Sequence, residues 1–366
     1  IITEYNPYHL GHRLHLQEAK KLIKPDLTIC VMSSSFVQRG EPAIISYQKR
    51  AAIAIEEGID IVIELPLVYA CQSADYFAKG AVTLLFGSDD GNIETFIEIA
   101  EGIEQDPDTY NMKVKEGMKD GLRYPDACNQ ALQFILNKEV RTPNDLLGLS
   151  YVKEVVHNQY PISMHCIKRT NDYHAKNIER ISSATSLRIA LKQGIDVSHQ
   201  LPGYNTYKDS HFFTLEEFYP YLKYLITFTP LEGLHMIEEG LDDRLYKVNQ
   251  ETYSLEELIN SLTSKRYTRS RIQRMLIHIL LHNTKEEMKK AMDIDYIHIL
   301  GLSASGQRYI KTAKKNTEYK IITNITKHKH PALDIEKRGA QLLDLVNPGF
   351  FKETIKAIPY RKIDLK

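Results

Sequence analysis

The fold prediction rests first on one stretch near the start of the chain, Thr3-Glu4-Tyr5-Asn6-Pro7-Tyr8-His9-Leu10-Gly11-His12. The residues Ile1-Ile2-Thr3 indicate the end of a first strand, and Asn6-Pro7 predicts a turn. We then expect a helix from near His9 toward Lys24, which Pro25 ends. His9 and His12 are three residues apart, so they share one face of the first helical turn.

This expected helix start has the chemistry of a phosphate-binding site. The free backbone N–H groups and the positive dipole end of the helix lie beside the two imidazoles. Gly11 has no side chain, so a flat base can lie against the backbone there. Together these groups suit the charge on a phosphoryl group under attack. The alternative is a pair of solvent-facing histidines near a turn, but the position between the first strand and first helix favours the nucleotide site.

The rest of the chain falls into two regions of different pattern. Buried strands are predicted at 27–32, 60–64 and 163–167, with a helix at 49–57, which indicates βαβ units. In such sheets, ligands lie beyond the carboxyl ends of the strands. The later helices are expected at 215–227, 230–239, 254–264, 267–281 and 285–292. The predicted fold class is α/β, with a Rossmann-like parallel sheet over residues 1–195 followed by a mainly α-helical domain over residues 196–366.

Composition excludes several classes of protein. The 366 residues carry 47 Lys and Arg and 47 Asp and Glu, so the molecule as a whole is not a basic nucleic-acid binder. Every apolar run is shorter than the ~18–20 residues needed to span a bilayer. The start lacks the features of a signal peptide, and without a Met it is expected to lie inside the first element. Scattered cysteines predict buried free thiols, no built-in metal site and a cytoplasmic location.

A second stretch with phosphate-binding chemistry is Ser182-Ser183-Ala184-Thr185-Ser186-Leu187-Arg188. Its hydroxyls can cap a helix that starts near Ser186. With Arg188 close behind, the capped N–H groups and hydroxyls predict a charge-assisted second phosphate site. The alternative is a well-capped helix without that function.

Two further stretches carry candidate binding residues. Gln38-Arg39-Gly40-Glu41-Pro42 follows the second strand, where Arg39 is positioned to hold a carboxylate or a phosphate, unless it belongs to an ordinary surface loop. We expect no such role for Lys49 and Arg50. The second stretch, residues 265–274, has five cations and no acid, which favours RNA phosphate over a solvated helix face. Its cations are Lys265, Arg266, Arg269, Arg271 and Arg274.

These motifs resemble a known superfamily, the nucleotidylyltransferases that include class I aminoacyl-tRNA synthetases. The resemblance rests on His-x-Gly-His after the first strand together with the later Ser-Ser-x-x-Ser-x-Arg. More narrowly, four stretches are similar to the bacterial tRNA(Met) cytidine acetate ligases. They are Ile2 to His9, Gln38-Arg39-Gly40-Glu41-Pro42-Ala43, Asn144-Asp145-Leu146-Leu147-Gly148 and Lys265-Arg266-Tyr267-Thr268-Arg269.

The resemblance implies a nucleotidylyltransferase domain at 1–195 and a tRNA-binding role for the helical domain. It further implies formation of acetyl-adenylate from acetate and ATP, with Mg²⁺ arriving with ATP, followed by acetylation of the wobble cytidine of elongator tRNA(Met). We assign charge stabilisation at the phosphate to His9, His12 and Arg188. The full set of expected ATP-binding residues is Thr3, Glu4, Tyr5, Asn6, Pro7, His9, Gly11, His12, Leu16, Gly87, Asn144, Arg169, Ser183, Thr185 and Ser186.

Two other functions remain compatible with the motifs. An adenylyltransferase that makes a dinucleotide-type cofactor would use the same phosphate sites, but would not need the basic stretch. A nucleotide-dependent RNA-binding factor without chemistry would need neither histidine. Two segments are also shorter than expected, near Leu85-Phe86 and between His174 and Ile181.

Overall fold

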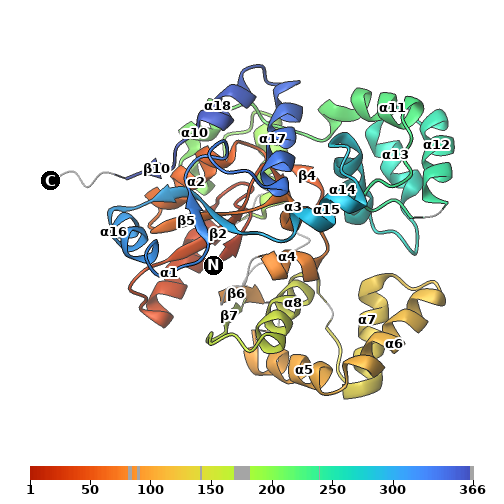
Figure 1. Ribbon diagram of the computed structural model, residues 1–366, viewed down its shortest axis with the longest axis horizontal. Helices are drawn as coiled ribbons and strands as arrows, with labels where there is room; N and C mark the ends of the chain where they lie inside the picture. The colour runs from red at the N-terminus through yellow and green to blue at the C-terminus, as the bar shows by residue number, and fades with distance from the viewer. Residues whose placement is uncertain (81–84, 89–90, 141, 169–181, 239, 363–366) are drawn as a thin grey trace.

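The computed structural model describes residues 1–80, 85–88, 91–140, 142–168, 182–238 and 240–362 (Figure 1). The strands are β1 Ile2–Thr3, β2 Ile29–Ser33, β3 Phe36–Val37, β4 Glu41–Pro42, β5 Ile61–Leu65, β6 Leu85–Ser88, β7 His165–Lys168, β8 Tyr296–Leu302, β9 Lys320–Ile322 and β10 Tyr360–Arg361. No helix in these ranges is long and apolar enough to cross a membrane.

The helices alternate with these strands early in the chain and dominate its later part. Up to residue 192 they are α1 Leu10–Ile23, α2 Tyr47–Glu56, α3 Leu67–Ala70, α4 Ala74–Gly80, α5 Ile93–Gln105, α6 Pro107–Lys119, α7 Tyr124–Leu136, α8 Pro143–His157 and α9 Ala184–Lys192. After it they are η1 Ser198–Gln200, α10 Tyr204–Lys208, η2 Glu216–Phe218, α11 Tyr219–Phe228, α12 Leu241–Glu251, α13 Leu255–Leu262, α14 Arg269–Leu280, α15 Lys285–Ala291, α16 Ala304–Ala313, α17 Pro331–Asp344 and α18 Phe350–Lys356.

The main sheet confirms the α/β prediction and adds a feature to it. Its strand order is β1-β2-β5-β8-β10, with β9 beside β8. The predicted β1, β2 and β5 are parallel, and most of the side chains of β2 and β5 are buried, as expected for a sheet with helices on both faces. β8 runs antiparallel to β5, so the sheet is mixed. β1 leads into the turn at Asn6, and β2 is followed by β3 and then by the loop at Gln38.

Strands β8 to β10 were not predicted, because residues 296–302 form a short apolar run that periodicity alone does not assign to strand or helix. In the structure all but one of these seven residues are buried, and they pair with β5. The region after residue 196 therefore contributes to the sheet as well as supplying helices. The division into two domains at residue 195 stays a prediction.

The later strand expected at 163–167 is present as β7, which pairs with β6 in a separate sheet and does not join the main one. β6 and β7 are parallel, with Leu85 opposite His165. α8 packs against β6, and α1 packs against β7. Leu85 and Phe86 are consecutive residues of β6. The other short segment, from His174 to Ile181, lies outside the described residues.

Helices α11 to α14 pack against one another in sequence order, on the right of Figure 1. Four of the five helices expected in the later part of the chain are present, as α11, α13, α14 and α15. The helix predicted at 230–239 is wrong, because residues 230–238 form turns around Gly233, whose φ is +80°. The predicted apolar side of the basic helix is confirmed, with its four members fully or almost fully buried: Ile272, Met275, Leu276 and Ile279.

Candidate active site

The two histidines of the opening motif form the N-terminus of α1. His9 is the N-cap, and its Nδ1 accepts a hydrogen bond from Gly11 N–H at 3.0 Å. His12 Nδ1 accepts a bond from His9 N–H at 3.3 Å. Their rings are stacked, with centroids 3.9 Å apart. The two side chains thus pair with backbone donors that a helix start leaves without intrahelical partners.

These hydrogen bonds determine where each imidazole carries its proton. A ring nitrogen that accepts an N–H bond has no proton of its own, so in both rings the proton lies on Nε2. Each histidine then presents a neutral ring with an Nε2–H donor. Donors fixed in this way suit the stabilisation of charge on a phosphoryl group, as the sequence predicts.

Buried aromatic rings hold His12 in place. The Tyr5 ring meets His12 edge-on at 5.0 Å, and the Tyr8 ring lies 5.6 Å away. Both tyrosines are buried, and Tyr8 N–H donates to Tyr207 Oη at 2.9 Å. Leu16, five residues after Gly11 on α1, packs into the same hydrophobic core. In this structure Tyr5 packs against the His12 ring, and Leu16 lies in the same hydrophobic core as Tyr5. The expected contact with ATP stays a prediction for both residues.

The turn before His9 joins the two motifs that the sequence analysis treated separately. The Asn6–Pro7 bond is cis, and Asn6 Oδ1 accepts a bond from Ile44 N–H at 2.7 Å. The Asn6 carbonyl accepts a bond from Arg188 Nη1 at 2.7 Å, across 182 residues of sequence. Arg188 Nη2 also donates to Thr185 Oγ1 at 3.4 Å. The structure therefore brings Arg188 to the histidine motif, as required for two groups acting on one phosphate.

Arg188 reaches this position from the first turns of α9. Ser183 is the N-cap of α9, and its Oγ accepts a bond from Ser186 N–H at 3.2 Å. Just before the cap, Ser182 N–H donates to Gln200 Oε1 at 2.7 Å. Ser186 is buried, whereas Thr185 is exposed. The predicted capped helix is confirmed, and the phosphate-binding role of its hydroxyls stays a prediction.

Glu4 connects the first motif to the loop that contains Arg39. Its Oε1 accepts a bond from Gln38 N–H at 2.7 Å. Removal from water raises the pKa of Glu4, while the Gln38 bond and the charges of Arg39, Arg188 and Arg50 act in the opposite direction. Glu4, Arg39 and Arg188 are therefore close enough to interact electrostatically. Thr3 contributes locally, since its Oγ1 accepts a bond from Tyr5 N–H at 3.2 Å.

Arg50 has a structural role that the sequence did not reveal. It is fully buried and donates to three backbone carbonyls, those of Glu4, Ser34 and Ile45. Burial lowers the pKa of Arg50 to about 10, so the guanidinium stays charged at neutral pH. Arg50 thus ties α2 to the segments that follow β1 and β2, where the candidate site lies.

Two of the remaining residues that the family resemblance assigned to ATP, Gly87 and Asn144, lie on the second sheet and on the helix that packs against it. Gly87 is in β6, opposite Ile167 of β7. Asn144 is in the first turn of α8, which packs against β6 and is capped by Thr142. Arg169 lies outside the described residues. The nucleotide-binding roles of all three stay predictions.

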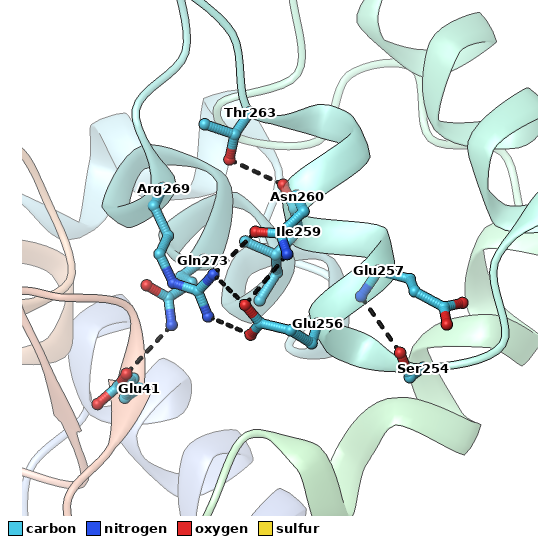
Figure 2. Close-up of polar contacts among 9 residues, drawn as sticks. All are labelled: Glu41, Ser254, Glu256, Glu257, Ile259, Asn260, Thr263, Arg269 and Gln273. Atoms are coloured by element: carbon cyan, nitrogen blue, oxygen red, sulfur yellow. Dashed lines mark hydrogen bonds and ion pairs between the residues drawn. The ribbon is translucent and has the colours of Figure 1, made fainter.

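The basic stretch divides into an exposed part and a part that faces the protein. Lys265 and Arg266 are exposed and precede α14. Arg269, at the first residue of α14, donates to both carboxylate oxygens of Glu256 and to Asn260 Oδ1 (Figure 2). The exposed part therefore offers cations to a partner, although Arg269 pairs with Glu256 and Arg266 Nη2 lies 3.6 Å from Glu238 Oε2.

The other two arginines of the stretch are held by the protein. Arg271 Nη2 donates to Glu238, and its guanidinium lies 4.7 Å from the centre of the Tyr267 ring. Arg274 Nη1 donates to the Gln38 carbonyl at 3.0 Å, and burial lowers the pKa of Arg274 to about 10. RNA binding by these two stays a prediction, but the geometry assigns Arg274 to the contact between α14 and the 38–41 loop.

Sequence reasoning missed the residues that make this contact. An added Cβ at Gly40, whose φ is +79°, would lie 2.2 Å from the backbone nitrogen of Arg274. Gln273 Nε2 donates to Glu41 Oε1 at 3.1 Å (Figure 2). The glycine between Arg39 and Glu41 was the available signal, since a glycine in a tight loop often marks positive φ or a close backbone approach.

Among the residues described by the structure, no three His, Cys, Asp or Glu side chains gather into a metal site. Cys30, Cys71 and Cys128 are buried free thiols, which confirms that expectation for these three.

Comparison with known proteins agrees with the motifs. The family model described as HIGH Nucleotidyl Transferase matches residues 1–356. A protein of Geobacillus sp. (strain WCH70) named tRNA(Met) cytidine acetate ligase is 38% identical, over 93% of this chain and 92% of its own. A protein of the same name from Bacillus subtilis (strain 168) is 35% identical over 94% and 91%.

A solved structure matches nearly the whole chain. Thermotoga maritima TmcAL, bound with alpha-thio ATP, has a TM-score of 0.86 and 28% identity over 99% of this chain and 98% of its own. The match includes the mixed sheet as well as the helices after residue 196. The chain therefore belongs to the HIGH nucleotidyl transferase family and, within it, to the family of the tRNA(Met) cytidine acetate ligases.

Proposed function

We propose that this chain is an ATP-dependent ligase that activates acetate as acetyl-adenylate and acetylates the exocyclic amine of the wobble cytidine of elongator tRNA(Met). The observation that carries the proposal is the bond from Arg188 to the Asn6 carbonyl, which joins the two predicted phosphate-binding motifs three residues before His9. The names of the relatives support the substrates. The ATP analogue in the Thermotoga maritima structure supports the nucleotide.

In the first step, an acetate oxygen attacks the α-phosphorus of ATP. The bond to the pyrophosphate oxygen breaks, and pyrophosphate leaves with the electron pair. Negative charge increases on the oxygens of the α-phosphate during this step. The Nε2–H donors of His9 and His12 and the guanidinium of Arg188 are arranged to stabilise that charge. Arg39, in the loop between β3 and β4, is our candidate for holding the acetate carboxylate or a phosphate, and its charge acts on Glu4.

In the second step, the cytidine amine attacks the acetyl carbonyl, and AMP leaves. The cytidine must be unstacked for its amine to reach the adenylate. The exposed cations Lys265, Arg266 and Arg269 are the best-placed members of the basic stretch to bind the RNA backbone. Binding phosphate would require Arg269 to exchange or share its bonds to Glu256.

We further propose that Mg²⁺ enters with ATP. This ion prefers oxygen ligands and is commonly held by substrate phosphates with one or two carboxylates and water. It would neutralise charge on the departing pyrophosphate. None of the steps assigned above to the protein's own side chains depends on a metal site within the chain.

Acetate-dependent ATP–pyrophosphate exchange tests the first step. His12→Ala should lower the exchange rate by about 10²–10³-fold, the usual effect of losing one such donor. His157→Ala is the matched control, because His157 is exposed on α8 and pairs with Glu104. Wild-type exchange in His12→Ala would contradict the assignment of His12.

The choice of acid and acceptor needs a panel. Exchange should occur with acetate among small acids, and tRNA should be acetylated when added. Exchange only with a phosphorylated acceptor would point instead to a cofactor adenylyltransferase. Tight tRNA binding without exchange would point to an RNA-binding factor.

A further inference from the structure

The 38–41 loop is fixed between the histidine motif and α14. On one side, Gln38 N–H donates to Glu4 Oε1 at 2.7 Å. On the other, the Gln38 carbonyl accepts a bond from Arg274 Nη1 at 3.0 Å. Gly40 lies directly against the α14 backbone, because an added Cβ there would meet main-chain atoms of Gln273 and Arg274 at 2.2–2.8 Å. The position of α14 therefore determines where the loop lies.

Glu41, at the end of this loop, connects α14 to the candidate catalytic arginine. Its Oε1 accepts a bond from Gln273 Nε2 at 3.1 Å, as Figure 2 shows. Its Oε2 lies 3.8 Å from Arg188 Nη2. Gln273 is only 6% exposed, so its amide is held firmly and fixes the carboxylate in turn. A chain of three polar side chains thus runs from α14 to the Asn6 turn.

Glu41 lies among cations from two helices. Besides Arg188, its charge acts on Lys192 of α9 and on Arg269 of α14. The Arg188 side chain is 15% exposed and that of Glu41 is 32% exposed. An ion pair between such partly shielded groups is weakened less by salt than one between fully exposed groups. The pair is therefore able to influence the orientation of the guanidinium.

We propose that Glu41, held by Gln273, is a positioning residue for Arg188 in the ATP step. This inference rests on the proposed role of Arg188 at the phosphate. An arginine side chain loses up to about 2 kcal/mol of conformational entropy when it is ordered. A donor that is already oriented stabilises developing charge without reorganisation during the reaction. The carboxylate also repels incoming phosphate, so it favours the rate of the chemical step over tight binding of ATP.

The test compares three variants in acetate-dependent exchange without tRNA. Glu41→Gln removes the ion pair but keeps an oxygen that can accept the Gln273 bond. It should lower kcat about tenfold, without raising the KM for ATP and without a change in the thermal midpoint. Gln273→Met removes the bond that holds the carboxylate, and should lower kcat about threefold. Glu256→Gln is the control: it removes the acid that pairs with Arg269, a cation assigned to tRNA, and should leave exchange without tRNA unchanged.

A double-mutant cycle separates positioning from a merely structural effect. If Glu41 acts through Arg188, adding Glu41→Gln to Arg188→Lys should cost little more than Arg188→Lys alone. Multiplicative losses would overturn the inference, as would a wild-type kcat in Glu41→Gln or a raised KM with kcat unchanged. Wild-type protein without acetate-dependent exchange would instead refute the proposed function. If the wild-type protein exchanges and Glu41→Gln exchanges at the same rate, the positioning role of Glu41 is refuted and the proposed function is not.

Discussion

Replacing Gly40 with alanine tests how closely the 38–41 loop is held against α14. The new methyl group would lie 2.2 Å from Arg274 N, 2.5 Å from Gln273 C and 2.8 Å from Arg274 Cα. All three are main-chain atoms of a helix and cannot rotate away. Gly40 also has a φ of +79°, where a side chain costs roughly 1–2 kcal/mol. Overpacking of this kind adds about 1–3 kcal/mol.

Gly240→Ala is the matched control. Gly240 has the same φ of +79°, but an added Cβ meets nothing within 4 Å. It therefore has the backbone strain without the contact. Applying an unfolding entropy of about 2.1 cal/mol/K per residue to 366 residues, each kcal/mol lowers the midpoint by about 1.3 °C. We expect a decrease of about 1–3 °C for Gly240→Ala and about 3–6 °C for Gly40→Ala.

The activity assay provides the more specific result. Since the loop must move away from α14 to admit the methyl group, Glu41 and Gln38 move with it. Acetate-dependent exchange should fall by about tenfold or more in Gly40→Ala and stay at the wild-type rate in Gly240→Ala. Equal midpoints and equal exchange rates in the two variants would refute the reasoning.

Three further predictions concern other parts of the molecule. Arg50→Leu leaves three buried carbonyls without their donor, at about 1–3 kcal/mol each, so its thermal midpoint should fall by several degrees; an unchanged midpoint contradicts this. Arg266→Ala should reduce the slope of the logarithm of the tRNA-binding constant against the logarithm of salt concentration by roughly one unit, while Arg308→Ala on α16 should leave that slope unchanged. The same slope in both variants would mean that Arg266 does not contact tRNA phosphate. Burial lowers the pKa of His278 to about 3 and of His235 to about 4. Below pH 6.5 the unfolded chain therefore binds more protons than the folded chain, and stability decreases as the pH decreases. The free energy of unfolding, measured by denaturant titration, should be up to about 4 kcal/mol lower at pH 5 than at pH 7. Equal stability at the two pH values contradicts this expectation.

The sequence predicted the parts of the site that depend on neighbouring residues. The turn at Asn6, the helix start near His9 and the stop at Pro25 are signalled by neighbouring residues, so local chemistry was enough to place α1. The cap at Ser183 was predicted for the same reason. In each case the structure added the partner, such as the Asn6 carbonyl that accepts a bond from Arg188.

What the sequence did not predict depends on contacts between distant segments. β8 pairs with β5 across more than 230 residues, and nothing in its short apolar run specifies that partner. The sequence showed the positive charge of residues 265–274, but it did not show which side of the helix packs against the 38–41 loop. Gly40 and Gln273 determine that contact, so Arg274 faces the loop while Arg266 faces solvent.

Transfer of acetate to RNA is the reaction that a single assay can follow from ATP to product. Purified protein is incubated with ATP, radiolabelled acetate and elongator tRNA(Met), and the tRNA is digested to nucleosides. We expect label in acetylated cytidine that requires ATP and is lost in His12→Ala and in a tRNA without the wobble cytidine. Absence of label from the tRNA of the wild-type reaction, or label that appears without ATP, would contradict it.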